Sequence, residues 1–159
     1  MKMIHSRDDK NRLQMQKIVD KTFDTNIGQV VCFLGDHIMV CTNIKFEEMV
    51  QDLAQEIGSV ELARLVLSGE SVDFELDKQG RFQIPRDYLK GAFEERECYI
   101  ISVKGAFKSD NYVEIFPKSI YEKIVEEFVE KTSFSENSGL KGQFSKLKGE
   151  GDEERRREN

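Results

Sequence analysis

The pattern of apolar and polar positions predicts the same order of elements in two successive stretches of the chain. Apolar runs of strand length occur in equivalent places, at 29–34, 37–41, 98–103 and 112–116. Each pair of predicted strands is followed by a helix, because apolar residues recur there at helical spacing. We expect the first of these helices to be capped by Asn43 and the second to begin at Pro117. Short helices are expected ahead of the strand pairs, at 17–23 and 85–90. A repeated order of this size indicates one small module used twice.

The remaining segments complete the predicted organisation. An amphipathic stretch at 60–68 predicts a linking helix, and apolar alternation at 70–76 predicts a strand that leads into the second copy, with 3–6 as its shorter counterpart. From Ser133 onward Ser, Gly, Lys and Glu dominate, which is typical of a mobile tail. The predicted boundaries are module 1 at 1–54, the linking helix at 55–69, module 2 at 70–132 and a flexible charged tail at 133–159.

A short polar phrase occurs near the start of each copy. It reads Asp8-Asp9-Lys10-Asn11-Arg12 in the first and Asp77-Lys78-Gln79-Gly80-Arg81 in the second, with the two arginines 69 positions apart. Aspartate accepts backbone N–H bonds at the start of a turn, and Asn or Gly tolerates a left-handed backbone. Each phrase therefore predicts a tight hairpin turn with positive φ at Asn11 and Gly80.

The arginines are not needed to make such a turn, and two readings are open for them. Arg12 and Arg81 can be solvated charges that pair with the aspartate four positions before. Alternatively, they are offered to an anion together with Lys10 and Lys78, because guanidinium grips phosphate or a guanine edge through two parallel donors. In that reading the aspartate orients the arginine.

The distribution of charge favours an anionic partner. The formal net charge of −6 opposes nucleic-acid binding when taken alone. However, residues 1–17 carry five basic and two acidic side chains, and residues 77–90 carry four and two. A phosphate backbone responds to the local potential within a Debye length of roughly 10 Å. The positive charge is concentrated around the two phrases.

Several classes of protein are disfavoured by the sequence. No apolar run approaches the roughly 20 residues of a membrane helix, and the first residues lack the apolar stretch of a signal peptide. The widely spaced Cys32, Cys41 and Cys98 read as reduced structural thiols, and His5 and His37 do not cluster with them as a zinc site requires. No nucleophile motif or phosphate loop is found. We expect a cytosolic protein that is not an enzyme, without cofactor, metal, membrane partner or small-molecule substrate.

The phrases resemble those of the MraZ family, whose members carry two tandem modules of the SpoVT/AbrB type. The family pattern is Asp-x-Lys-Gly/Asn-Arg followed by an apolar-polar-apolar-Pro run, which the second copy matches at 77–85. In the first copy Gln16 stands where the family usually has proline. The resemblance covers about residues 3–130.

This resemblance implies an α+β fold in which two swapped-hairpin AbrB-like modules form one pseudo-twofold barrel with helices packed outside. It further implies a cytoplasmic, nucleoid-associated transcriptional regulator that assembles into a homo-oligomeric ring. Such proteins bind short direct DNA repeats upstream of the cell-division and cell-wall gene cluster that contains their own gene. The implied DNA-binding residues are Asp8, Lys10, Asn11, Arg12, Asp77, Lys78, Gly80 and Arg81. Arg7 and Arg86 are added as flanking phosphate contacts on charge and position alone.

An AbrB-type antitoxin, or an interaction module of the same fold with reduced or lost DNA binding, is the alternative. Such proteins are usually single-copy with a disordered partner-binding tail. The long polar tail supports this alternative, whereas the two copies and the linking helix disfavour it.

Overall fold

The computed structural model describes residues 1–24, 28–33, 35–88 and 94–132, so the predicted tail lies outside the described residues. The chain divides into two compact units, Met1–Lys118 and a second that begins at Ser119. The strands are β1 (Lys2–Ser6), β2 (Arg12–Gln14), β3 (Gln29–Phe33), β4 (Ile38–Thr42), β5 (Ser71–Asp73), β6 (Arg81–Gln83), β7 (Glu97–Val103) and β8 (Tyr112–Pro117). The helices are α1 (Gln16–Thr22), α2 (Asn43–Ile57), α3 (Val60–Gly69) and α4 (Lys118–Lys131), with short 3₁₀ turns η1 (Arg86–Tyr88) and η3 (Lys108–Asp110).

Six strands form one antiparallel sheet in the order β1-β7-β8-β4-β3-β5. We refer to β1–β4 as the strands of the first half and to β5–β8 as those of the second half. The order is symmetric, because the central pair β4–β8 joins the two halves and each half contributes its first strand to the edge of the other. Thus Met3 of β1 lies opposite Ile100 of β7, and Val72 of β5 lies opposite Val31 of β3.

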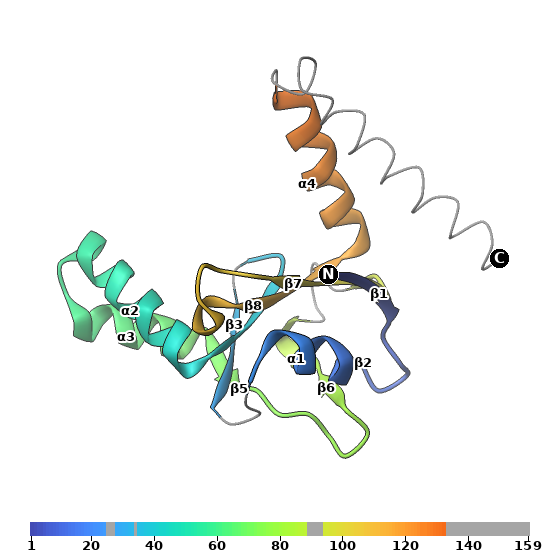
Figure 1. The fold of residues 1–159 in the computed structure, drawn as a ribbon, viewed down its shortest axis with the longest axis horizontal. Helices are drawn as coiled ribbons and strands as arrows, with labels where there is room; N and C mark the ends of the chain where they lie inside the picture. The colour runs from blue at the N-terminus through green and yellow to red at the C-terminus, as the bar shows by residue number, and fades with distance from the viewer. Residues whose placement is uncertain (25–27, 34, 89–93, 133–159) are drawn as a thin grey trace. The chain divides into compact units, whose positions relative to one another are not determined.

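The other two strands, β2 and β6, pair only with each other among the described strands, as an antiparallel ribbon. Leu13 lies opposite Phe82 at its centre, with Arg12 opposite Gln83 and Gln14 opposite Arg81. Leu13 and Phe82 are buried, whereas both glutamines are exposed. Alternation along each short strand therefore turns the apolar positions inward and the polar positions outward. Figure 1 shows the ribbon beside α1.

One core is built from both halves of the chain. Its fully buried side chains come from the ribbon, from α1 and from one face of the six-stranded sheet, and they include Leu13, Met15, Ile18, Val31, Ile38, Val40, Ile84, Ile100, Val113 and Ile115. Burial of a side chain of this size contributes about 1.5–3 kcal/mol. The ribbon and its loops are thus fixed on a core to which both halves contribute.

Helices α2 and α3 lie side by side (Figure 1). Val50 and Ala54 of α2 pack with Ala63 of α3, and Gly58 ends α2 in the left-handed conformation at φ 76°. The predicted linking helix at 60–68 is confirmed as an element, since α3 covers Val60–Gly69. No helix in the described part of the chain is long and apolar enough to cross a membrane.

The α+β class is confirmed, and the sheets do not form the predicted pseudo-twofold barrel as a closed barrel. The six-stranded sheet is open, with β1 and β5 as its edges, and β2 and β6 form a separate ribbon. Two local predictions are also corrected. Thr42 caps α2 in place of Asn43, because its hydroxyl accepts a hydrogen bond from the amide of Lys45 at 3.2 Å. The strand predicted at 70–76 is reduced to Ser71–Asp73, and beyond it Leu76 only forms an isolated bridge with Phe82.

Candidate nucleic-acid interface

The repeated phrases form two loops of the same conformation, loop 1 (Asp8–Arg12) and loop 2 (Asp77–Arg81). In each, the fourth residue donates its amide hydrogen to the carbonyl of the leading aspartate, at 3.0 Å for both Asn11 and Gly80. The predicted positive φ is confirmed at 60° for Asn11 and 77° for Gly80. Loop 1 joins strands of different sheets, because β1 pairs with β7 and β2 with β6. The predicted tight turn is confirmed, although the two strands that loop 1 joins do not pair with each other.

Each leading aspartate holds its own loop together and orients its own arginine. The carboxylate of Asp8 accepts from the backbone amides of Lys10 and Arg12 at 3.0 and 2.9 Å, and from Nε of Arg12 at 2.7 Å. Asp77 accepts from the amides of Gln79 and Arg81 at 2.9 Å each, and from Nε of Arg81 at 2.8 Å. The arginine–aspartate ion pair is thus present in both copies. This ion pair uses only the Nε donor of each arginine, which is one of the five N–H donors of a guanidinium. The other four donors are on the two Nη nitrogens.

The ribbon brings the two loops together. The antiparallel register places Arg12 opposite Gln83 and Arg81 opposite Gln14, so loops that are 69 positions apart in sequence meet across two short strands. Their closest charged contact is between Nη1 of Arg81 and Oδ2 of Asp8, at 3.9 Å. Lys10 and Lys78 are exposed on the same loops. Four cationic side chains are therefore carried by one pair of adjacent loops.

The two flanking arginines differ in their surroundings. Arg7 is only 7% exposed, and its guanidinium donates to the carbonyls of Glu94 and Glu95 and to Oδ1 of Asn11. This placement makes Arg7 a support of loop 1, which disfavours the predicted phosphate contact. Arg86 is exposed on η1, where its position remains compatible with such a contact.

The loop hydrogen bonds change the acidity of both aspartates. Reduced contact with water raises the pKa of Asp8, but hydrogen bonds from Arg12 and Lys10 outweigh this effect, and its pKa lies below the ordinary value of 3.8. The pKa of Asp77 is also lowered, chiefly by the hydrogen bond from the backbone of Arg81. Both carboxylates stay ionised at neutral pH and remain acceptors for the arginines.

A pH titration checks this arrangement. Since both pKa values are lower in the folded loops, the carboxylate bonds stabilise the loops above pH 3.8 and are lost as the pH falls below it. We expect the amide NMR signals of Arg12 and Arg81 to shift with midpoints below 3.8. The Asp77→Asn variant should abolish this response at Arg81 and keep it at Arg12. Midpoints at or above 3.8 in the parent protein contradict the loop geometry.

The structure reveals two contacts that sequence reasoning missed. Gln14 and Gln83 each reach the opposite loop, donating from Nε2 to the carbonyls of Gln79 and Lys10. The sequence contained one signal, because the two glutamines occupy the same position of the repeat.

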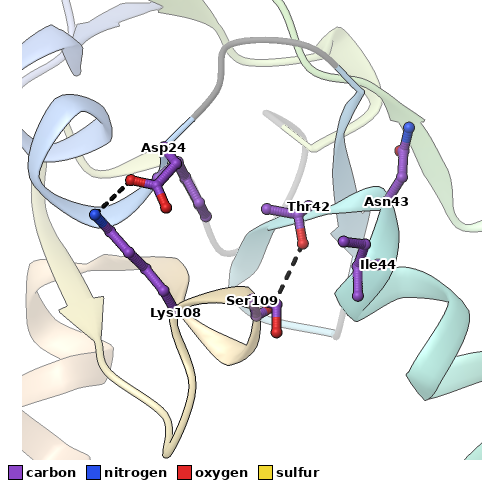
Figure 2. Close-up of a pocket in the computed structure, with 7 residues that line it drawn as sticks. Asp24, Thr42, Asn43, Ile44, Lys108 and Ser109 are labelled. Carbon is purple, nitrogen blue, oxygen red and sulfur yellow. Dashed lines mark hydrogen bonds and ion pairs between the residues drawn. The ribbon is translucent and has the colours of Figure 1, made fainter.

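A separate hollow of about 220 Å³ has no residue of loop 1 or loop 2 in its lining (Figure 2). Asp24 and Lys108 form an ion pair there, and the hydroxyl of Thr42 donates to the carbonyl of Ser109 at 3.5 Å. The remaining lining residues are Phe23, Asn43 and Ile44. The charged groups of this hollow neutralise each other. Within the described residues, no group of three or more His, Cys, Asp or Glu side chains is placed to hold a metal ion.

Comparison with known proteins finds related sequences. Residues 67–141 match the family described as "MraZ protein, putative antitoxin-like". The chain is also 27% identical over 129 residues to proteins named Transcriptional regulator MraZ from three strains of Mesomycoplasma hyopneumoniae, 7448, J and 232. Each of these alignments covers 76% of this chain and 80% of the relative. The chain is therefore similar over most of its length to proteins named Transcriptional regulator MraZ.

Proposed function

We propose that this protein is a sequence-specific DNA-binding transcriptional regulator, and that loops 1 and 2 together form its DNA-contact surface. The observation that carries the proposal is the pairing of two Asp-x-x-x-Arg loops across the β2–β6 ribbon, with each arginine oriented by its own aspartate. The name of the Mesomycoplasma relatives, Transcriptional regulator MraZ, supports the same function.

The residues of the surface have different roles in this proposal. Arg12 and Arg81 contact phosphates or guanine edges, and Lys10 and Lys78 contribute point charges to the backbone. Asp8 and Asp77 orient the arginines, while Asn11 and Gly80 permit the left-handed turn. Arg86 is a flanking phosphate contact, and Arg7 supports loop 1 from beneath.

The assembly and the cellular role are part of the same proposal. We propose that the symmetric strand order represents two interlocked AbrB-type modules, and that several chains associate into a ring that engages short direct repeats upstream of the division and cell-wall genes, including its own. Arrays of weak loop contacts gain affinity when several are engaged at once. The proposed location is the cytoplasm, in association with the nucleoid.

A binding titration against salt tests the DNA-contact surface. We expect the fragment upstream of the protein's own gene to shift in a gel assay, and a scrambled fragment of equal length to bind more weakly. Log affinity should fall linearly with log salt, with a slope of about −0.9 for each phosphate neutralised. If no upstream fragment shifts at low salt, the proposed function is rejected.

A second candidate, an interaction module of antitoxin type, is favoured by one observation on α3. Its residues Leu62, Leu65 and Val66 are 50%, 70% and 50% exposed, although Ala63 on the same helix is fully buried against α2. A helix that is apolar on both faces is typical of one buried in an assembly. In this reading the protein binds a partner chain and leaves the upstream fragment unshifted in the gel assay.

A further inference from the structure

We propose that Gln14 and Gln83 are crossed positioning residues, each of which holds the DNA-contact loop of the opposite half. Their importance for DNA rests on the proposed function, whereas the crossed support of the loops is a property of the free protein. The consequence is that the two loops act as one coupled unit.

The crossed contacts are the same in both directions. Nε2 of Gln14 donates to the carbonyl of Gln79 at 2.8 Å, and Nε2 of Gln83 donates to the carbonyl of Lys10 at 2.7 Å. Like the glutamines, Lys10 and Gln79 are 69 positions apart. A carbonyl near the tip of each loop is therefore held by a side chain that belongs to the other half.

Backbone hydrogen bonds reinforce this crossing. The amide of Met15 donates to the carbonyl of Gly80 at 2.9 Å, and the amide of Ile84 donates to the carbonyl of Asn11 at 3.0 Å. Thus two consecutive carbonyls of each loop accept hydrogen bonds from the opposite half, one from its ribbon strand and one from the residue that follows that strand. The aspartate determines the shape of its own loop, whereas the opposite glutamine fixes where that loop lies on the ribbon.

The support of loop 2 is stronger than that of loop 1, because of Gln16. The amide of Gln16 donates to Oε1 of Gln14 at 3.1 Å, so both polar atoms of the Gln14 side-chain amide are hydrogen-bonded. Gln83 has no equivalent donor, because Pro85 occupies the matching position and lacks an N–H. The side chain of Gln16 is itself fixed by a bond to Asp20 at 2.7 Å.

Gly80 shows how closely this support fits loop 2. A Cβ at this position would lie 2.5 Å from Cβ of Gln16 and 2.9 Å from Oε1 of Gln14. The backbone of loop 2 therefore rests directly on these two glutamines. Gln16 lies in the first half of the chain and stands where the family usually has proline. Its side chain nevertheless packs against the loop of the second half.

Hydrogen exchange of the free protein tests the crossing without DNA. The Gln14→Met variant keeps the length of the side chain and removes both the donor to Gln79 and the acceptor for the amide of Gln16. We expect exchange of the amides of Gln79, Gly80 and Arg81 to accelerate about threefold to tenfold, which corresponds to the loss of one hydrogen bond. The amides of Lys10, Asn11 and Arg12 should change less than about twofold.

Matched variants give the reciprocal result and the control. Gln83→Met should accelerate exchange in loop 1 and leave loop 2 nearly unchanged, and Gln14→Glu should behave like Gln14→Met. Gln51→Met, at an exposed position of α2, should affect neither loop. Acceleration in the loop of the same half, or equally in both loops, overturns the proposal.

DNA binding supplies an independent test of the coupling. Gln14→Met should weaken binding of the upstream fragment when added to Arg12→Ala, and should have little further effect when added to Arg81→Ala. Equal losses in both backgrounds contradict the assignment. If exchange shows the crossing while the parent protein binds no upstream fragment, the proposed function fails and the crossed positioning of the loops stands.

Discussion

Replacing Arg81 with alanine should weaken binding of the upstream DNA about 5-fold to 150-fold, the range for loss of one specific base contact worth about 1–3 kcal/mol. The physical reason is the orientation of the guanidinium. Asp77 holds its Nε at 2.8 Å, and Asp8 lies 3.9 Å from Nη1, so the group is placed before DNA arrives. Binding to the fragment can be measured by fluorescence anisotropy at fixed salt.

Three further variants separate specific contact from charge and from assembly. Arg81→Lys keeps the positive charge and loses the planar guanidinium with its parallel donors. Compared with Arg81→Ala, it should therefore restore only the salt-dependent part of the affinity for the upstream DNA. Lys104→Ala removes one exposed charge from the β7–β8 connection and should have a much smaller effect. Arg12→Ala tests the first copy, and a result equal to the parent makes loop 1 architectural. The oligomeric state should be unchanged in Arg81→Ala, and an assembly that dissociates would overturn the contact role.

Replacing Gly80 with alanine should destabilise the fold by about 2–4 kcal/mol, through two additive causes. The φ of 77° is unfavourable for any residue with a Cβ and costs about 1 kcal/mol. The new methyl group also overlaps the Cβ of Gln16 at 2.5 Å, and overpacking of this kind costs about 1–3 kcal/mol. Urea unfolding followed by circular dichroism measures the difference.

Gly58→Ala is a matched control for this prediction. Gly58 has nearly the same φ, 76°, but a Cβ there meets no heavy atom within 4 Å. It should therefore show the conformational cost alone. Equal losses for the two variants would mean that the glutamines do not pack against Gly80. A Gly80→Ala/Gln16→Ala double variant keeps the Cβ of residue 16 and should relieve little of the overlap.

The local conformation of the loops was predictable from sequence, and their partners were not. Positive φ at Asn11 and Gly80 follows from residue chemistry in a short turn, and the repeat itself is visible in the order of apolar runs. Apolar alternation indicates which face of a strand is buried, but it does not indicate which other strand pairs with it. The pairing of β1 with β7 and of β5 with β3, which makes the sheet open and symmetric, is therefore found only in the structure.

In the candidate site, too, the local features could be predicted from the sequence and the long-range contacts could not. The aspartates and arginines of the loops could be selected because their spacing within each loop is short and repeated. The sequence nominates Arg7 on charge and position alone, but two of its three acceptors are the carbonyls of Glu94 and Glu95, 87 and 88 positions away. The contacts of Gln14 and Gln83 likewise depend on the register of the β2–β6 ribbon. Long-range contacts of this kind carry no local signal in the sequence.

The exchange of edge strands between the halves also has a consequence during synthesis. Lys2 of β1 lies opposite Ile101 of β7, so β1 has no partner in the sheet until almost a hundred further residues have been made. Contacts of such separation require closure of a long chain segment, which slows folding. An unpaired strand edge that persists for this time is open to association with other nascent chains. Strand β1 therefore depends on β7, which is made much later, for protection of its edge.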